Sequence, residues 1–161
     1  MFKAVVTDLD GTLLNNDKEV SEFSKEVINK IRDKGIKFFI ATGRSYPDTK
    51  RIMETIGIKV PLITSNGARI NDENGETIYA NDLEKKYSKK ILDTDYKKYG
   101  EEIFLNLYSD NKWFITEEMT RDPFKDLKHF LPNKITVDEA KELSVSKFFF
   151  IGDHENLLKL E

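Results

Sequence analysis

The sequence contains no cysteine and no hydrophobic run long enough to cross a bilayer. Its 161 residues include 0 Cys, which excludes disulfides, thiolate metal sites and a cysteine nucleophile. The longest apolar stretches, at 38–41 and 148–152, fall far short of the roughly 20 residues that a membrane-spanning helix needs. We therefore expect no transmembrane helix.

A basic excess is also missing. The chain has 26 Lys+Arg against 29 Asp+Glu, a formal net charge of −3, whereas binding to nucleic acid or anionic lipid needs a basic surface. At the N-terminus, Asp8 and Asp10 interrupt the apolar run 4–6 before the hydrophobic region of a signal peptide could form. Since 39% of the residues are hydrophobic, a folded core is expected. These features predict a cytoplasmic protein that binds neither nucleic acid nor membrane.

The first half of the chain alternates strand and helix patterns. Continuous apolar runs predict buried strands over 3–8, 36–41 and 60–64, the first of them buried on both faces. A helix is expected from the N-cap Ser21 to Gly35, with Phe23 on its inward side, and a second from Pro47 to Gly57. Short connections with right-handed crossovers make this β-α-β-α-β pattern a parallel, Rossmann-like sheet. Asn74-Gly75 then predicts a hairpin between strands 68–71 and 76–80.

The pattern changes near residue 81. The later segments predict helices over 83–99, 124–131 and 154–161 and strands over 103–108, 113–116 and 147–151. Mixed strands and helices after a parallel unit indicate a second, α+β module. We therefore expect an α/β fold with a Rossmann-like domain at 1–81 and an α+β domain at 82–161.

Two aspartates follow directly on the first predicted strand. Because side chains alternate along an extended chain, Asp8 and Asp10 project to the same side, at the strand end where α/β proteins bind ligands. Two such carboxylates repel each other unless a cation lies between them, and oxygen ligands suit Mg²⁺. One carboxylate could attack phosphorus to form an aspartyl-phosphate, and the other could act as general acid and base. The alternative is that Asp-x-Asp-Gly is only an acidic turn.

Polar residues also follow the second and third predicted strands. Thr42 can donate its hydroxyl to a phosphoryl oxygen, Gly43 allows close approach, and Arg44 can contact phosphate with two N–H groups. The next helix start adds free N–H groups and a favourable dipole. Asn66 lies where it could reach substrate, although Ser-Asn-Gly needs no function beyond a turn.

Together these segments resemble the haloacid dehalogenase-like hydrolases, and within them the Cof-type phosphatases with an α/β cap inserted after the third strand. The matching segments are 4–12, Ala41-Thr42-Gly43-Arg44 and 62–68. The resemblance implies that Asp8 is the nucleophile and a Mg²⁺ ligand, and that Asp10 is the acid/base with its main-chain carbonyl on Mg²⁺. It further implies that Thr42 binds the phosphoryl group and that the cap begins near Asp82.

The chain departs from the family pattern in its second half. No Lys-Gly of the expected core context follows the cap segment, and Gly152-Asp153-His154-Glu155-Asn156 lacks the final Asp of the family's last motif. We interpret Asp153 as a turn or N-cap residue of the cap. The chain is therefore expected to be the N-terminal portion of a longer phosphatase, with weak Mg²⁺ binding and slow turnover.

The favoured hypothesis is a Mg²⁺-dependent phosphomonoester hydrolase that acts on a small phosphorylated metabolite, such as a sugar phosphate. One alternative is a catalytically silent fragment that binds phosphate or a partner protein. Another is a phosphoacceptor receiver domain of signalling type, in which the phosphorylated Asp ends the third strand. Here Thr64-Ser65-Asn66 occupies that position, which disfavours the receiver domain.

Overall fold

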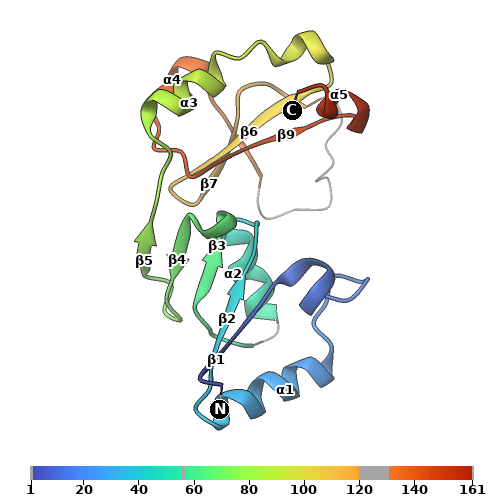
Figure 1. Ribbon diagram of the computed structural model, residues 1–161, viewed down its shortest axis with the longest axis vertical. Coiled ribbons are helices and arrows are strands. Elements are labelled where there is room, and N and C mark those ends of the chain that lie inside the picture. The colour runs from blue at the N-terminus through green and yellow to red at the C-terminus, as the bar shows by residue number, and fades with distance from the viewer. Residues whose placement is uncertain (1, 56, 120–130, 161) are drawn as a thin grey trace. The chain divides into compact units, whose positions relative to one another are not determined.

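The chain forms two compact units, Met1–Asn81 and Asp82–Glu161 (Figure 1). The computed structural model describes residues 2–55, 57–119 and 131–160. Each unit contains one sheet and its own hydrophobic core. Within these described ranges, no helix is both long enough and apolar enough to cross a membrane.

The first unit is an α/β unit built on a five-stranded sheet of order β1-β2-β3-β4-β5. Its elements are β1 (Ala4–Thr7), α1 (Glu22–Asp33), β2 (Lys37–Ala41), α2 (Tyr46–Thr55), β3 (Leu62–Thr64), β4 (Arg69–Asn71) and β5 (Thr77–Ala80). The first three strands are parallel neighbours, and β3, β4 and β5 pair antiparallel. This confirms the predicted Rossmann-like pattern and the hairpin at Asn74-Gly75.

The core of the first unit lies where the two helices meet the sheet. Ile40 of β2 and Leu62 of β3 are buried in it together with Ile28 of α1 and Met53 of α2. The start of α1 is fixed locally, because the Ser21 hydroxyl accepts a hydrogen bond from the Ser24 N–H at 3.1 Å. The sheet therefore has one well-buried face, and α1 and α2 cover that face.

The prediction that the first strand is buried on both faces is wrong. Among the strands that the structure describes, β1 lies at the edge of its sheet and pairs with β2 alone. Val5 packs against the core, so the next side chain along the strand projects to the opposite face, where Val6 is 57% exposed. Phe23 is exposed as well, because it is the turn of α1 around Ile28 that contacts the core.

The second unit contains a four-stranded sheet of order β8-β7-β6-β9. Its elements are α3 (Lys85–Leu92), β6 (Phe104–Ser109), β7 (Lys112–Ile115), β8 (Asn133–Lys134), α4 (Val137–Glu142), β9 (Lys147–Ile151) and α5 (His154–Leu158). The turn between β6 and β7 has positive φ at both Asp110 (44°) and Asn111 (59°), as a tight hairpin requires. The predicted strands around this turn and over 147–151 are confirmed.

The helices of the second unit differ from the prediction. The expected helix 83–99 is shorter, since α3 ends at Leu92 and a separate 3₁₀ turn covers Tyr96–Tyr99. Short polar residues explain the break, because the Thr94 hydroxyl donates to the carbonyl of Lys90 at 2.9 Å and competes with further helix. Of the expected helix 124–131, residues 124–130 lie outside the described residues, and Leu131 is not helical.

Helix α4 was not predicted, although the sequence carries its signal. The Thr136 hydroxyl accepts from the Glu139 N–H, and the Glu139 carboxylate accepts from the Thr136 N–H at 2.7 Å. This reciprocal arrangement is a capping box, which the spacing Thr-x-x-Glu predicts.

The contrast between the two faces of the first sheet predicts unequal effects of truncation. Ile40→Ala removes a side chain with 0% exposure and should lower the free energy of unfolding by about 2–5 kcal/mol. Val6→Ala, on the open face, should cost less than about 1 kcal/mol. Urea unfolding followed by far-ultraviolet circular dichroism measures both, and equal losses would contradict the edge position of β1.

Candidate active site

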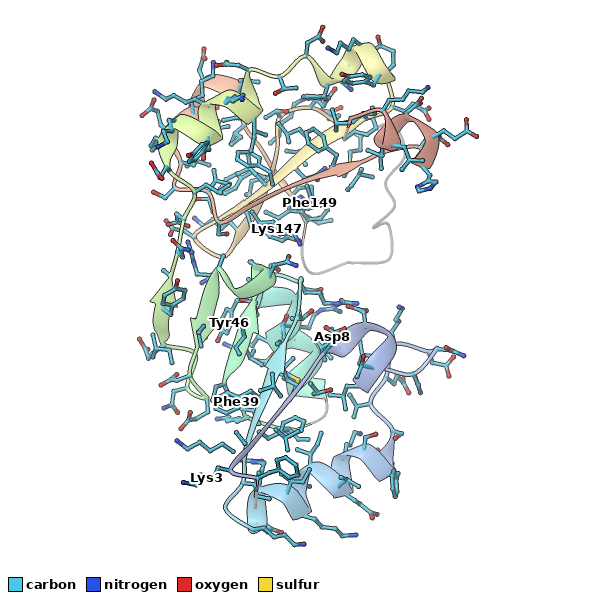
Figure 2. All side chains as sticks on the ribbon, in the orientation of Figure 1. Lys3, Asp8, Phe39, Tyr46, Lys147 and Phe149 are labelled. Atoms are coloured by element: carbon cyan, nitrogen blue, oxygen red, sulfur yellow. The ribbon has the colours of Figure 1, made fainter. Side chains whose placement is uncertain are left out.

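Asp8 and Asp10 flank an anchored leucine directly after β1. Leu9 is fully buried in the core of the first unit, while Asp8 and Asp10 on either side of it are exposed (Figure 2 labels Asp8). The chain then turns through Gly11, whose φ is +71°, and the Leu14 N–H closes the turn on the Leu9 carbonyl at 2.9 Å. Burial of Leu9 thus holds both carboxylates at the end of the strand.

Arg44 joins this turn to the loop after β2. Its Nε donates to Oδ2 of Asp10 at 2.7 Å and its Nη2 donates to Oδ1 at 2.8 Å, which makes a forked ion pair. Its Nη1 donates to the Asp48 carboxylate on α2 at 2.6 Å. The guanidinium expected to face phosphate therefore bridges two carboxylates in this structure, and its phosphate role stays a prediction. Asp48 was missed, although its i,i+4 spacing from Arg44 near a helix start was a usable signal.

This pairing fixes the charge state of Asp10. The hydrogen bonds from Arg44 lower the pKa of the Asp10 carboxyl below its ordinary value, and the charge of Lys18, whose Nζ lies 3.7 Å away, adds to the effect. The pKa of the Arg44 guanidinium is raised in turn, chiefly by its hydrogen bonds to Asp10. At neutral pH Asp10 is an ionised carboxylate.

The donor set is compatible with a hard divalent cation. Both carboxylate oxygens of Asp10 accept from Arg44, so the oxygens on offer are the Asp8 carboxylate and the Asp10 main-chain carbonyl. Mg²⁺ commonly takes one or two carboxylates and completes its six positions with water and substrate phosphate. Among the residues that the structure describes, no group of three or more His, Cys, Asp or Glu side chains is placed to hold a metal. The pair therefore fits Mg²⁺ in its chemistry and leaves most of the coordination positions to other oxygens.

Thr42 and Gly43 lie in the loop between β2 and α2. Thr42 is 6% exposed, and its hydroxyl oxygen accepts from the Arg44 N–H at 3.2 Å. A hydroxyl that accepts in this way can still donate its own proton to another oxygen. The loop leads directly into α2 at Tyr46. Its geometry is thus compatible with the predicted contact to a phosphoryl oxygen.

Asn66 is brought against this same loop. It lies in the turn Ser65–Gly67 that follows β3, and its N–H donates to the Thr42 carbonyl at 3.2 Å. The Ser65 N–H donates to the Arg44 carbonyl at 2.8 Å. Of the predicted site residues, Thr42, Gly43, Arg44 and Asn66 are therefore contiguous in space, and Arg44 connects them to Asp10. Asp8 joins the set through the chain, two residues before Asp10.

Asp153 belongs to the second unit and caps its last helix. Its side chain accepts a hydrogen bond from the Glu155 N–H at 3.0 Å at the start of α5. The interpretation of Asp153 as an N-cap residue is confirmed.

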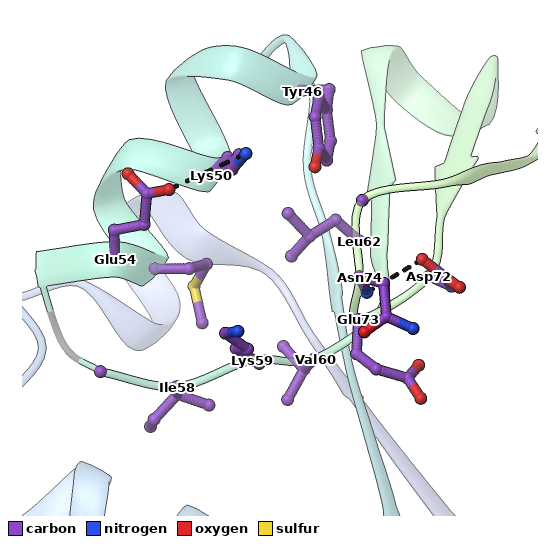
Figure 3. Close-up of a pocket in the computed structure, with 13 residues that line it drawn as sticks. Tyr46, Lys50, Glu54, Ile58, Lys59, Val60, Leu62, Asp72, Glu73 and Asn74 are labelled. Carbon is purple, nitrogen blue, oxygen red and sulfur yellow. Dashed lines mark hydrogen bonds and ion pairs between the residues drawn. The ribbon is translucent and has the colours of Figure 1, made fainter.

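A pocket of about 360 Å³ lies between α2 and the turn that connects β4 to β5 (Figure 3). Tyr46 and Lys50 of α2 line one side, and Asp72–Gly75 line the other. Its floor is formed by the core residues Met53, Ile58, Val60 and Leu62. None of the predicted site residues lines this pocket, so it is separate from the aspartate site.

Comparisons with known proteins agree with the expected family. A family model of haloacid dehalogenase-like hydrolases matches residues 5–161. A curated "Putative phosphatase" of Buchnera aphidicola subsp. Baizongia pistaciae is 42% identical over 116 residues, which cover 72% of this chain and 43% of that protein. An "HMP-PP phosphatase" of Serratia proteamaculans is 30% identical over 168 residues, which cover 100% of this chain and 58% of that protein.

Among solved structures, a sugar phosphatase of haloacid dehalogenase subclass IIB superposes with a TM-score of 0.75 at 22% identity, over 98% of this chain and 62% of that one. This likeness concerns the fold. The chain spans about half the length of the curated relatives it matches. Because the family model covers nearly the whole sequence, the chain belongs to the haloacid dehalogenase-like hydrolases, in the Cof-type branch that the motifs at Asp8 and Thr42 indicated.

Proposed function

We propose that this chain carries the phosphoryl-accepting site of a Mg²⁺-dependent phosphomonoester hydrolase. The observation that supports this most is the forked pair between Arg44 and Asp10, which joins the Asp8–Asp10 turn to the Thr42–Arg44 loop. Phosphoryl transfer requires chiefly that groups be positioned and that charge be neutralised. The carboxylates, the hydroxyl and the guanidinium of this site are the groups that such a task needs.

The proposed reaction has two steps. An oxygen of the Asp8 carboxylate attacks phosphorus, and the bond from phosphorus to the ester oxygen breaks. The ester oxygen departs as an anion when Asp10 is ionised, and it receives a proton from Asp10 only in molecules in which Asp10 has first been protonated. Water then attacks the aspartyl-phosphate while Asp10 accepts its proton, which releases phosphate and restores Asp8. The lowered pKa of Asp10 favours its role as base in the second step. Leaving groups that are stable as anions should therefore react faster than alkoxides.

Binding of the phosphoryl group is assigned to four residues. Thr42 would donate its hydroxyl, Gly43 would let the loop approach closely, and Asn66 and the remaining N–H groups of Arg44 would contact phosphoryl oxygens. Mg²⁺, held by Asp8 and Asp10, would neutralise charge on the phosphoryl oxygens. The relatives named HMP-PP phosphatase and sugar phosphatase support a small phosphorylated metabolite as substrate.

The two units would divide this task. We assign residues 1–81 to the catalytic core and residues 82–161 to a cap that selects the substrate. Support comes from the division of the chain into compact units at Asn81 and from the α+β organisation of the second unit.

A second candidate is a silent fragment that binds phosphate or a partner protein. One observation favours it: among the described residues, no group of three or more His, Cys, Asp or Glu side chains is placed to hold a metal. Such a fragment would bind inorganic phosphate without turnover.

Covalent phosphorylation separates the two candidates. With Mg²⁺ and p-nitrophenyl phosphate, the protein should gain one phosphoryl group on Asp8, and Asp8→Asn should abolish that gain because an amide is a poor nucleophile. Rapid quenching followed by peptide mass spectrometry measures it. Asp17→Asn, which changes an exposed carboxylate outside the site, is the matched control and should still be labelled. If the wild-type protein gives neither label nor nitrophenol, the silent alternative holds.

The charge state of Asp10 should depend on Arg44. Arg44→Gln should raise the pKa of Asp10 toward 3.8, its ordinary value, because the forked hydrogen bonds are lost. A carboxyl whose pKa is lowered by folding stabilises the folded protein at pH values above its ordinary pKa, and this stabilisation is lost as the pH falls through the lowered pKa. In Arg44→Gln the stabilisation from Asp10 should vanish, so acid unfolding should begin at a higher pH. Carboxyl ¹³C NMR titration measures the pKa.

Arg51→Gln is the control for that experiment. Arg51 contacts Asp48 at 3.3 Å and contributes nothing to the lowered pKa of Asp10, so its loss should leave that pKa unchanged. An unchanged pKa in Arg44→Gln would show that the forked pair does not govern Asp10.

A further inference from the structure

Three consecutive residues after β3 have left-handed backbone conformations. The φ angles are 51° at Ser65, 59° at Asn66 and 92° at Gly67. Such values cost little for glycine and more for residues with a Cβ atom, with asparagine among the most tolerant. Ser65 is buried at 5% exposure, whereas the Asn66 side chain is exposed. A conformation of this kind persists only where surrounding contacts hold it.

The contacts that hold this turn are those to the loop after β2. The Ser65 N–H donates to the Arg44 carbonyl at 2.8 Å, and the Asn66 N–H donates to the Thr42 carbonyl at 3.2 Å. Successive N–H groups of an extended strand point to opposite sides, whereas those of a helical turn point the same way. The left-handed turn thus lets two consecutive N–H groups reach the same neighbouring loop.

From that loop the contacts continue to Asp10. The Arg44 N–H donates to the Thr42 hydroxyl, and the Arg44 guanidinium forks onto the Asp10 carboxylate. The turn therefore acts on the main chain of the residues that present both the hydroxyl and the guanidinium of the proposed site. Its contribution comes from its backbone conformation, and no hydrogen bond of the Asn66 side chain enters this chain of contacts.

We propose that Asn66 is a positioning residue, chosen because asparagine tolerates the left-handed conformation that holds the Thr42–Arg44 loop, and thereby Arg44, against Asp10. The inference rests on the proposed function for its catalytic meaning, but the placement of Arg44 can be measured without turnover. It differs from the assignment of Asn66 as a phosphate ligand, because it makes the backbone of Asn66, and not its amide group, responsible for the effect.

Substitutions at Asn66 separate the two roles. Asn66→Gly removes the amide and keeps the left-handed conformation accessible. Asn66→Val should lower the equilibrium population of that conformation by about tenfold or more. The pKa of Asp10, followed by carboxyl ¹³C NMR, reports whether Arg44 is still in place. We expect that Asn66→Gly leaves this pKa lowered and that Asn66→Val raises it toward the value found in Arg44→Gln.

Asn111 supplies a matched control. It has the same residue type and the same φ of 59°, but it lies in the β6–β7 turn of the second unit. Asn111→Val should impose similar backbone strain and leave the pKa of Asp10 unchanged. Asn66→Ala, a milder change, provides the intermediate case if Asn66→Val does not fold.

Two results would overturn the proposal: a pKa of Asp10 that stays lowered in both Asn66→Val and Asn66→Ala, or one that rises equally in Asn66→Gly. In a kinetic version, Asn66→Gly loses only the amide that would contact phosphate, whereas Asn66→Val also loses the left-handed conformation. The positioning role therefore predicts that kcat/KM with p-nitrophenyl phosphate is lower in Asn66→Val than in Asn66→Gly by about tenfold or more. Absence of all turnover would count against the proposed function, and the pKa series would still decide the role of Asn66.

Discussion

The forked ion pair between Arg44 and Asp10 is the interaction on which the proposed site depends. It joins two segments separated by 34 residues in sequence, the turn after β1 and the loop after β2. Asp48 holds the same guanidinium from α2 at 2.6 Å, so three elements converge on one cation. Two N–H groups directed at two oxygens fix orientation as well as distance, which a lysine in this position would not do.

The carboxylates are exposed because the residue between them is buried. Leu9, at 0% exposure, ties the turn to the core while Asp8 and Asp10 remain exposed. The core that receives Leu9 is one-sided: the side chains of Ile40 and Leu62 face the helices, and Val6 on the other face is 57% exposed. The stability of the site thus derives from one face of the sheet.

Local signals predicted most of the first unit. Ser21 caps the start of α1, as its short polar side chain predicts, and Asn74-Gly75 forms the turn of the expected hairpin. Where prediction failed, a competing local signal had been overlooked, as with the capping box at Thr136 and the polar break after Leu92. The exposure of β1 could not be predicted from a local signal, because an apolar strand has the same sequence pattern at the centre of a sheet and at its edge.

The sequence alone therefore determined the alternation of strands and helices, the carboxylates at the end of the first strand and the family to which the chain belongs. These follow from side-chain period, caps and a contiguous motif, which are properties of neighbouring residues. Only the tertiary structure decided that Arg44 binds Asp10 and that the Ser65–Gly67 turn supports the Thr42–Arg44 loop. Such contacts depend on which strands become neighbours and on the backbone angles at a few turn residues, and no local pattern contains that information.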